Sequence, residues 1–327
     1  MKIIVDAMGG DYAPEVVVDG AVAAVKEYSV DVVLVGDEPK ISSLLKKTGY
    51  RGTKVTVHHA AETIGMSESA AISIRRKRNS SIVIGVGLVK DGHGDAFLSA
   101  GNTGAVVCAA TLSLGLLPGI ERPGIGIVTP TLKGIGLIID VGANIDPKPK
   151  QLMQYGIMGD AYCRYILNKP NPVVGLLNIG EEATKGTVAL KETRELLEAS
   201  NLNFIGNVEG KDLFSGKCDV VVCDGFVGNI ALKVSESLAE AMQEFLRRHI
   251  KSSLMGKLGA LLMIRNFSKF KKEMDYSEYG GAPLLGVNGS VIIGHGRSSA
   301  KAIKNAIRVT KEEVERGFNE KIIEAIR

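Results

Sequence analysis

Apolar residues along this chain fall into short, largely β-branched runs that alternate with longer segments of helical periodicity. Ile3–Val5 is followed by an amphipathic stretch over Glu15–Tyr28, and the alternation continues to the last segment, Ser299–Arg327. Spacing near 3.6 residues indicates a helix with one buried face, and a short continuous apolar run indicates a buried strand. The pattern therefore predicts an α/β fold, a mostly parallel sheet between two layers of helices.

The predicted strands are Ile3–Val5, Val32–Val35, Lys54–His58, Ala96–Leu98, Ile125–Thr129, Gly136–Asp140, Val173–Leu177, Asn203–Gly206, Val220–Cys223 and Val291–Ile293. The predicted helices are Glu15–Tyr28, Pro39–Lys47, Glu68–Lys77, Ser81–Lys90, Thr103–Leu116, Lys150–Leu167, Val188–Ser200, Val227–Ile250 and Ser299–Arg327. Ile125–Thr129 and Gly136–Asp140 are joined by a short segment with Pro and Gly, which predicts a hairpin and so an antiparallel pair in the sheet. No linker or repeat divides the chain, and we predict one domain over residues 1–327.

Several predicted strands end in a polar, glycine-containing turn that leads into a helix. The clearest is Asp219–Lys233, in which a β-branched strand stops at Asp224 and a helix follows. Open α/β sheets bind ligands at the carboxyl ends of strands, and a helix N-terminus offers N–H groups suited to an anion. Five further turns of this kind are Asp6–Pro14, Leu98–Val106, Ile138–Pro147, Asn178–Gly186 and Gly280–Ser299. We name these six turns elbows and expect them to form one shared site.

Composition favours a soluble enzyme. Of the 327 residues, 45% are hydrophobic and 23% are charged, and there are 39 glycines and no tryptophan. The four cysteines lie in apolar surroundings without metal-type spacing, so we interpret them as reduced core residues of a cytoplasmic protein. Lys2 enters a strand without the apolar region of a signal peptide, and no apolar run approaches the ~20 residues of a transmembrane helix.

The first two elbows offer polar groups for a phosphate. Asp6, Gly9 and Gly10 follow the first strand, where glycines allow close backbone approach to an anion; an ordinary tight turn is the alternative. Asn102 and Thr103 precede a helix, and either side chain can cap it or bind a ligand. We predict that Thr103 is the cap and that Asn102 is the ligand-binding residue.

The two middle elbows add a buried carboxylate and a lysine. Asp140 and Asn144 end a wholly apolar strand, a position where a carboxylate needs partners. Glu181 and Glu182 are interpreted as acidic residues that suit the start of a helix. Lys185 follows them, and a lysine near an elbow can hold a phosphate or polarise a carbonyl oxygen.

The last elbow places an imidazole, a guanidinium and a hydroxyl before the terminal helix. Arg297 suits bidentate phosphate contact, His295 suits proton transfer near neutral pH, and Ser298 lies beside them. The chain has no nucleophile motif of the Gly-x-Ser-x-Gly kind and no Cys–His arrangement of recognised spacing. This set of N–H groups, Lys, Arg, Asn and His, without a nucleophile, favours direct attack by a small oxyanion on an electrophile. Attack of phosphate on an acyl group is one such reaction.

One segment, which we name the arm and place at about residues 247–275, is strongly basic. Residues 247–272 hold eight Lys or Arg and no Asp or Glu, although the whole chain has a net charge of only +4. Its apolar stripe comprises Ile250, Leu254, Leu258, Leu261 and Leu262, flanked by Lys251, Lys257 and Arg265. The pattern is typical of an interfacial segment attracted to anionic lipid, and a helical arm packed across a dimer interface is the alternative. Without aromatic platforms, no nucleic-acid partner is expected.

Together, the motifs VDAMGGD, SAGNTGA, DVGAN, DGFVGNIALK and GGAPLLGVNG resemble the phosphate acyltransferase of bacterial phospholipid synthesis, the PlsX family. The resemblance spans the chain and implies transfer of a fatty acyl group from acyl carrier protein to inorganic phosphate. It also implies a homodimer with the three-layer fold of phosphotransacetylases and isocitrate-type dehydrogenases, without metal or nicotinamide. The acyl phosphate would pass to a membrane glycerol-3-phosphate acyltransferase of the PlsY type, so the protein is expected at the inner face of the cell membrane. A more distant likeness to phosphate acetyltransferases lacks their serine before the arginine, because Gly296 stands there.

Joining the residues to this resemblance gives a set of expected roles. Phosphate is expected among the elbow N–H groups, Arg297 and Lys185, while Asn229 or Asn102 hydrogen-bonds the thioester oxygen and Asp224 or His295 orients phosphate or accepts its proton. The candidate phosphate-binding set also includes Gly228, Gly281 and Asn288 of the same motifs.

Three functions are alternatives to acyl transfer from a carrier protein to phosphate. A phosphate acetyl- or butyryltransferase that uses acyl-coenzyme A is the closest, and the basic apolar arm argues against it because it favours a long chain and a carrier protein. A decarboxylating dehydrogenase requires a metal-binding aspartate set and a nicotinamide site, which the motifs do not supply. A non-catalytic membrane-docking protein leaves six polar elbows unexplained.

Overall fold

The computed structural model describes residues 1–274 and 276–326, without the side chains at positions 268, 271, 272, 274 and 276. One eleven-stranded sheet runs through the described chain in the order β3-β2-β1-β4-β11-β10-β5-β6-β9-β7-β8. Its strands are β1 Lys2–Asp6, β2 Asp31–Gly36, β3 Val55–His59, β4 Ala96–Ser99, β5 Gly124–Thr131, β6 Gly134–Ile139, β7 Val173–Leu177, β8 Asn203–Val208, β9 Val220–Val222, β10 Ala282–Leu285 and β11 Ser290–Ile293. The predicted hairpin is confirmed, since β5 and β6 pair in antiparallel fashion from Gly126 and Ile139 to Thr131 and Gly134.

The directions of the strands divide the sheet into two halves. β1, β2, β3, β4 and β11 are mutually parallel, and so are β6, β9, β7 and β8. Between them, β10 is antiparallel to both β11 and β5, and β5 is antiparallel to β6. The two parallel halves therefore run in opposite directions, and their carboxyl ends lie at opposite edges of the strand ladder.

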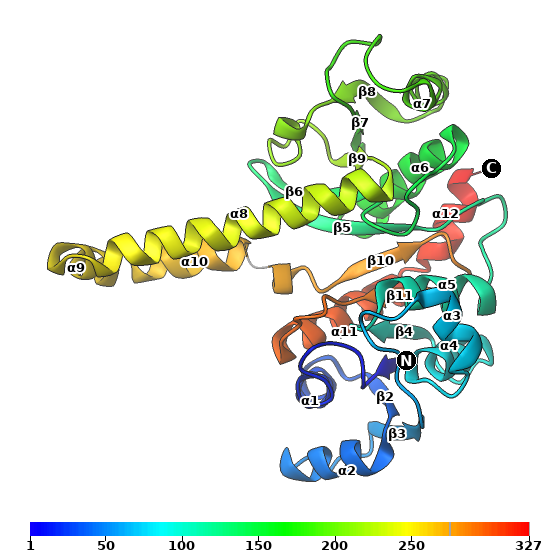
Figure 1. The fold of residues 1–327 in the computed structure, drawn as a ribbon, viewed down its shortest axis with the longest axis vertical. Coiled ribbons are helices and arrows are strands. Elements are labelled where there is room, and N and C mark those ends of the chain that lie inside the picture. The colour runs from blue at the N-terminus through cyan, green and yellow to red at the C-terminus, as the bar shows by residue number, and fades with distance from the viewer. Residues whose placement is uncertain (275, 327) are drawn as a thin grey trace.

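Helices cover both faces of the sheet (Figure 1). They are α1 Glu15–Tyr28, α2 Glu38–Lys47, α3 Ala70–Arg76, α4 Ser81–Lys90, α5 Thr103–Ser113, α6 Pro149–Tyr165, α7 Val188–Glu198, α8 Gly225–Lys251, α9 Leu254–Leu262, α10 Ile264–Met274, α11 Ala300–Glu315 and α12 Phe318–Ile326. Alternate residues of a strand point to opposite faces, so Ile4 packs with α4 and α5, while Ile3 and Val5 pack with α1 and α11. At the other end of the sheet, α6 and α12 cover the second face. These layers confirm the predicted α/β class.

Three element predictions need correction. β10 was missed because its four residues, which include Pro283, are too few to show a period. The predicted terminal helix is two helices, since Gly317 adopts a positive φ of 57° between α11 and α12. Ile250 belongs to α8 and the leucines of the arm to α9, because the helix stops at Lys251 and Ser253 caps the next one. Arg327, the predicted last helical residue, and position 275, the end of the arm, lie outside the described residues.

The arm stands clear of the sheet on the end of α8, with α9 at its tip and α10 leading back (Figure 1). Four predicted stripe residues, Leu254, Leu258, Leu261 and Leu262, are exposed, as are Lys251, Lys257 and Arg265. No helix in the described part of the chain combines the length and the apolar character needed to cross a membrane.

A buried carboxyl group makes the stability of this fold dependent on pH. Glu313 of α11 is only 4% exposed, and Ser290 Oγ donates to its Oε2 at 3.0 Å. Burial raises the pKa of Glu313 from about 4.5 to about 8, although the hydroxyl groups of Ser290 and Tyr162 oppose the shift. Because the folded protein binds this proton more tightly than the unfolded chain does, this contribution to stability is present at low pH and is lost as pH rises through 8.

We therefore expect Glu313→Gln to stabilise the protein at pH 8.5 and to have a smaller effect at pH 5. The gap between the two effects is on the order of a few kcal/mol, read from urea unfolding at both pH values. Glu312→Gln is the control, since Glu312 is a third exposed and pairs with Arg308. Equal effects of Glu313→Gln at both pH values would contradict the prediction.

Candidate active site

The elbows after β1 and β4 are locked together by Asp6. Its buried carboxylate accepts hydrogen bonds from Ser99 Oγ at 2.7 Å and from the Met8 N–H at 3.0 Å, and burial raises its pKa. A Cβ atom on Gly9 would lie 2.6 Å from Gly101 N, so glycine is required where the two elbows touch. Asp6 and Gly9, both predicted to bind phosphate, hold these loops in place.

Asn102, not Thr103, is the cap of α5, so the predicted cap was wrong. Asn102 Oδ1 accepts from the Ala105 N–H at 3.0 Å, and its Nδ2 lies 3.0 to 3.1 Å from the carbonyl oxygens of Gly65, Met66 and Glu68. The amide oxygen thus caps α5, and the amide nitrogen ties the helix to a neighbouring loop. Thr103 is the exposed first residue of the helix.

The elbow after β11 completes a first cluster and meets α8. Gly296 O accepts from the Asp11 N–H at 2.7 Å, which joins this elbow to the one after β1. On its other side, His295 Nε2 lies 3.7 Å from Glu236 Oε1 of α8, and Arg297 donates to Glu240 Oε1 at 3.2 Å. Burial lowers the pKa of His295, so the neutral imidazole is favoured. The buried Ser298 donates its backbone N–H to His295 O at 2.9 Å.

A second cluster forms after β6 and β9 around Asp140. Its fully buried carboxylate accepts from the N–H groups of Ile125 at 2.9 Å, Gly142 at 3.0 Å, Ala143 at 2.9 Å and Asn144 at 2.7 Å. Burial raises the pKa of Asp140, and these four donors oppose that rise. Asp140, which was predicted to bind phosphate, accepts these hydrogen bonds from its own loop and from β5.

α8 begins inside this second cluster. Asp224 Oδ1 caps the helix by accepting from the N–H groups of Phe226 at 3.0 Å and Val227 at 2.8 Å. Asn144 O accepts from Gly225 N at 2.8 Å, and its Nδ2 donates to Gln151 Oε1 at 3.3 Å. Asn229, one turn into the helix, is exposed and lies next to the loop after β6, 4.0 Å from the position of a Cβ on Gly142.

Lys185 and Asn288 lie outside both clusters. Lys185 is exposed, its carbonyl accepts from Asn178 Nδ2 at 3.2 Å, and its N–H donates to Glu182 O at 3.1 Å, all within one loop. Asn288 is in the turn between β10 and β11, at the opposite end of β11 from His295. Gly281 stands just before β10 with φ +115°, beside the end of β11. Hydrogen bonds among the described residues thus join five of the six elbows into two clusters, and the elbow that carries Lys185 belongs to neither.

A stripe of polar side chains on α8 connects the two clusters and was not predicted as a unit. Asn229, Lys233, Glu236 and Glu240 are spaced by four, three and four residues, which places them on one face of the helix. Lys233 Nζ lies 3.0 Å from Glu236 Oε2 and 3.5 Å from His295 Nε2. The helical spacing within DGFVGNIALK was the signal that identifies Lys233.

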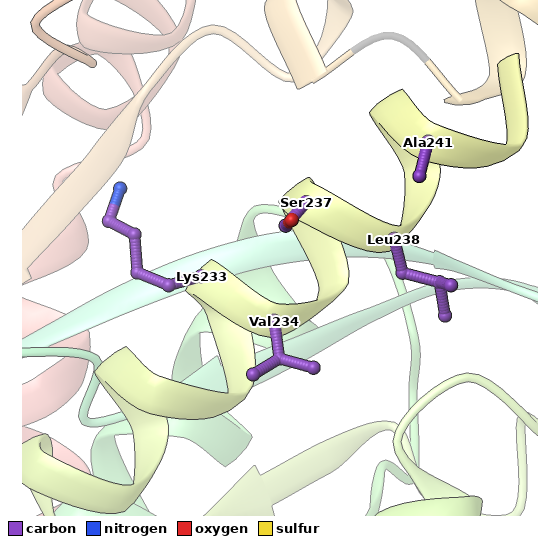
Figure 2. A pocket seen from close by; sticks show the side chains of 5 residues that line it. All are labelled: Lys233, Val234, Ser237, Leu238 and Ala241. Carbon is purple, nitrogen blue, oxygen red and sulfur yellow. The ribbon is translucent and has the colours of Figure 1, made fainter. Parts of the chain in front are cut away.

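A groove of 440 Å³ follows the same helix, lined by Lys233, Val234, Ser237, Leu238 and Ala241. Figure 2 shows the Lys233 side chain extending away from Val234 and Leu238. An apolar stripe of α8 is exposed along its length, comprising Ile230, Val234, Leu238, Met242 and Phe245. The helix therefore presents one polar face and one apolar face.

Solved structures define the class of this fold. A phosphotransacetylase from Streptococcus pyogenes matches with a TM-score of 0.67 at 18% sequence identity, covering 96% of this chain and 94% of that one. A branched-chain phosphotransacylase from Enterococcus faecalis V583 matches with a TM-score of 0.58 at 14% identity, covering 96% and 99%. The fold is therefore phosphotransacetylase-like, as predicted.

Closer relatives define the family. The family model described as fatty acid synthesis protein matches residues 1–321. The phosphate acyltransferase of Geotalea uraniireducens is 49% identical over 326 residues, and that of Thermodesulfovibrio yellowstonii is 50% identical over 326 residues; each match covers 100% of this chain and 94% of the relative. The chain belongs to this phosphate acyltransferase family and is an acyltransferase, which confirms the resemblance drawn from its motifs.

Proposed function

We propose that the protein transfers a long-chain fatty acyl group from acyl carrier protein to inorganic phosphate, giving an acyl phosphate for phosphatidic acid synthesis. The observation that carries the proposal is the pairing of His295 and Arg297 on one elbow against the polar face of α8, in a chain related over its full length to phosphate acyltransferases. A guanidinium binds phosphate in bidentate fashion, and the N–H of a neutral imidazole donates a hydrogen bond to it.

The proposed reaction is a direct displacement. A phosphate oxygen attacks the thioester carbonyl carbon, the new C–O bond forms as the C–S bond breaks, and the carrier leaves as a thiolate that takes up a proton. Arg297 holds the phosphate, and Asn229 donates to the carbonyl oxygen as its charge develops. Asn102 is less suited to that role because its amide is already bonded at both ends.

His295 orients the phosphate in this proposal by donating its Nε2–H, because its Nδ1 already accepts the Arg297 N–H at 3.2 Å. The attacking phosphate is the dianion, so no side chain has to accept a proton before the attack. Asp224 is less suited to orient phosphate, since its Oδ1 caps α8. Lys185, on the elbow after β7, stays a predicted phosphate ligand.

The test is to incubate the protein with palmitoyl-carrier protein, with and without phosphate, trapping acyl phosphate with hydroxylamine and following the carrier thiol. Phosphate-dependent thiol release with trapped hydroxamate supports the proposal. Release that is equally fast without phosphate would identify a thioesterase and overturn it. Release only from acyl-coenzyme A would move the assignment to a phosphate acetyl- or butyryltransferase.

We also propose that the arm attaches the protein to the inner face of the membrane, where the acyl phosphate passes to a glycerol-3-phosphate acyltransferase. The support is an apolar tip, with Leu254 78% exposed and Leu262 87% exposed, next to the exposed cations Lys251 and Lys257. The same cations suit an acidic carrier protein. The exposed apolar stripe of α8 supports a homodimer.

Vesicle binding tests the role of the tip. We expect Leu258→Glu with Leu262→Glu to weaken binding to phosphatidylglycerol vesicles by about tenfold or more, because each leucine contributes roughly 1.5–3 kcal/mol when buried in lipid. Leu132→Glu is the matched control, since Leu132 is 89% exposed in the turn between β5 and β6. Sedimentation with vesicles measures the change. Equal binding by the arm variant and the wild type would overturn the attachment proposal.

A further inference from the structure

We propose that Lys233 of α8 is a phosphate-binding residue, and that Glu236 and Glu240 hold Lys233 and Arg297 in position while competing with phosphate for them. The inference rests on the proposed function and assigns the lysine of its phosphate site. Lys233 Nζ lies 3.5 Å from His295 Nε2, on the elbow that carries Arg297.

The hydrogen bonds of His295 define where an anion fits. The Arg297 N–H donates to His295 Nδ1 at 3.2 Å, so in the neutral ring the proton is on Nε2. That N–H and the Lys233 ammonium both face the Glu236 carboxylate, at 3.7 Å to Oε1 and 3.0 Å to Oε2. Two donors that converge on a pair of carboxylate oxygens are also arranged to take two oxygens of a phosphate.

Arg297 makes the same kind of contact one turn further along. Its two guanidinium nitrogens lie 3.3 and 3.2 Å from Glu240 Oε1. Both side chains of this pair are more than half exposed, at 54% and 67%, so the pair is weak and easily exchanged. Glu240 thus orients Arg297 without binding it so tightly that phosphate is excluded.

The polar stripe also places phosphate beside the carbonyl that it attacks. Asn229 and Lys233 are four residues apart on one helix face, which separates them by about 5–6 Å between Cβ atoms. A thioester oxygen held by Asn229 and a phosphate held by Lys233 are then neighbours, as a direct displacement requires. Among the described residues, the hydrogen bonds of Lys185 stay within its own loop.

Steady-state kinetics in the hydroxamate assay separates these roles. We expect Lys233→Ala to raise the KM for phosphate by about 10–100-fold and to leave the KM for palmitoyl-carrier protein within about twofold, since a charge-assisted hydrogen bond is lost on the phosphate side only. Lys233→Arg restores part of the loss. We expect Glu240→Gln to lower the KM for phosphate, because it removes a competing charge.

The matched control is Lys40→Ala on α2, which removes an exposed lysine that pairs with Asp37 at the same i,i+3 spacing as Lys233 and Glu236. Circular dichroism checks that α8 is intact in each variant. An unchanged phosphate KM in Lys233→Ala, with active wild-type protein, overturns this inference alone; if Lys185→Ala then raises it, Lys185 is the phosphate lysine. A wild type that forms no hydroxamate overturns the proposed function instead.

Discussion

Gly228→Ala is expected to abolish acyl transfer and to destabilise the folded protein by about 3 kcal/mol or more, because the first turn of α8 leaves no room for a side chain. A Cβ atom at this position would lie 1.9 Å from Asp140 O and 2.8 Å from Cys223 Sγ. Asp140 O belongs to the backbone of the second cluster, so the steric clash is removed only if α8 moves away from the loop after β6. Asn229, the next residue, would move with it.

Helix propensity works in the opposite direction and makes the test sharper. Alanine is favoured over glycine inside a helix by about 1 kcal/mol, so a variant without a clash would be stabilised. Gly87→Ala in α4 is the matched control, since a Cβ there would meet no atom within 4 Å. Urea unfolding and the hydroxamate assay are the measurements. If both alanine variants are equally stable, the close approach of α8 to Asp140 is wrong.

The alternation of strands and helices was sufficient to predict the class of fold. Period-2 and period-3.6 patterns report which residues face the core, and that information is local, as with Ile3 and Ile4 on opposite faces of β1. Strand direction is not local. The reversal between the two halves depends on β10, which has too few residues to show a period, so the sequence pattern could not show that the elbows divide into two clusters.

The roles of the polar elbow residues were harder to predict for a related reason. An Asp that binds a ligand and an Asp that accepts hydrogen bonds from its own loop both occur at the end of a strand, so their positions in the sequence do not distinguish the two roles. Asp6, Asp140 and Asp224 all accept backbone N–H groups, as a turn requires of Asp. Lys233 shows the converse, because its spacing from Asn229 places both on one helix face, but its contact with His295 is seen only in the folded structure.

We expect Asp140→Ala to cost about 3 kcal/mol or more of stability, the second of the two large effects. The substitution leaves four backbone N–H groups without their acceptor in a fully buried site, and each buried unsatisfied donor costs roughly 1–3 kcal/mol. Water that enters the space left by the carboxylate recovers part of this loss. Asp140→Asn is expected to be nearly as damaging, since its Nδ2 would face an N–H group.

Asp37→Ala is the control for Asp140→Ala. Asp37 is an Asp at a comparable turn, but it accepts a single backbone N–H, that of Lys40 at 3.1 Å, as the cap of α2, so its loss should cost about 1 kcal/mol. Its other contact is an exposed ion pair with Lys40 Nζ at 3.0 Å, which adds little. Urea unfolding of both variants compares the two costs, and similar values would contradict the role of Asp140 as the acceptor that holds its loop in place.

The kinetics of the folded fraction add a second distinction. If Asp140 acts through its loop, its loss displaces Asn144, whose carbonyl holds Gly225 at the start of α8. Turnover then falls because Asn229 is displaced. If Asp140 bound phosphate directly, its loss would instead raise the KM for phosphate.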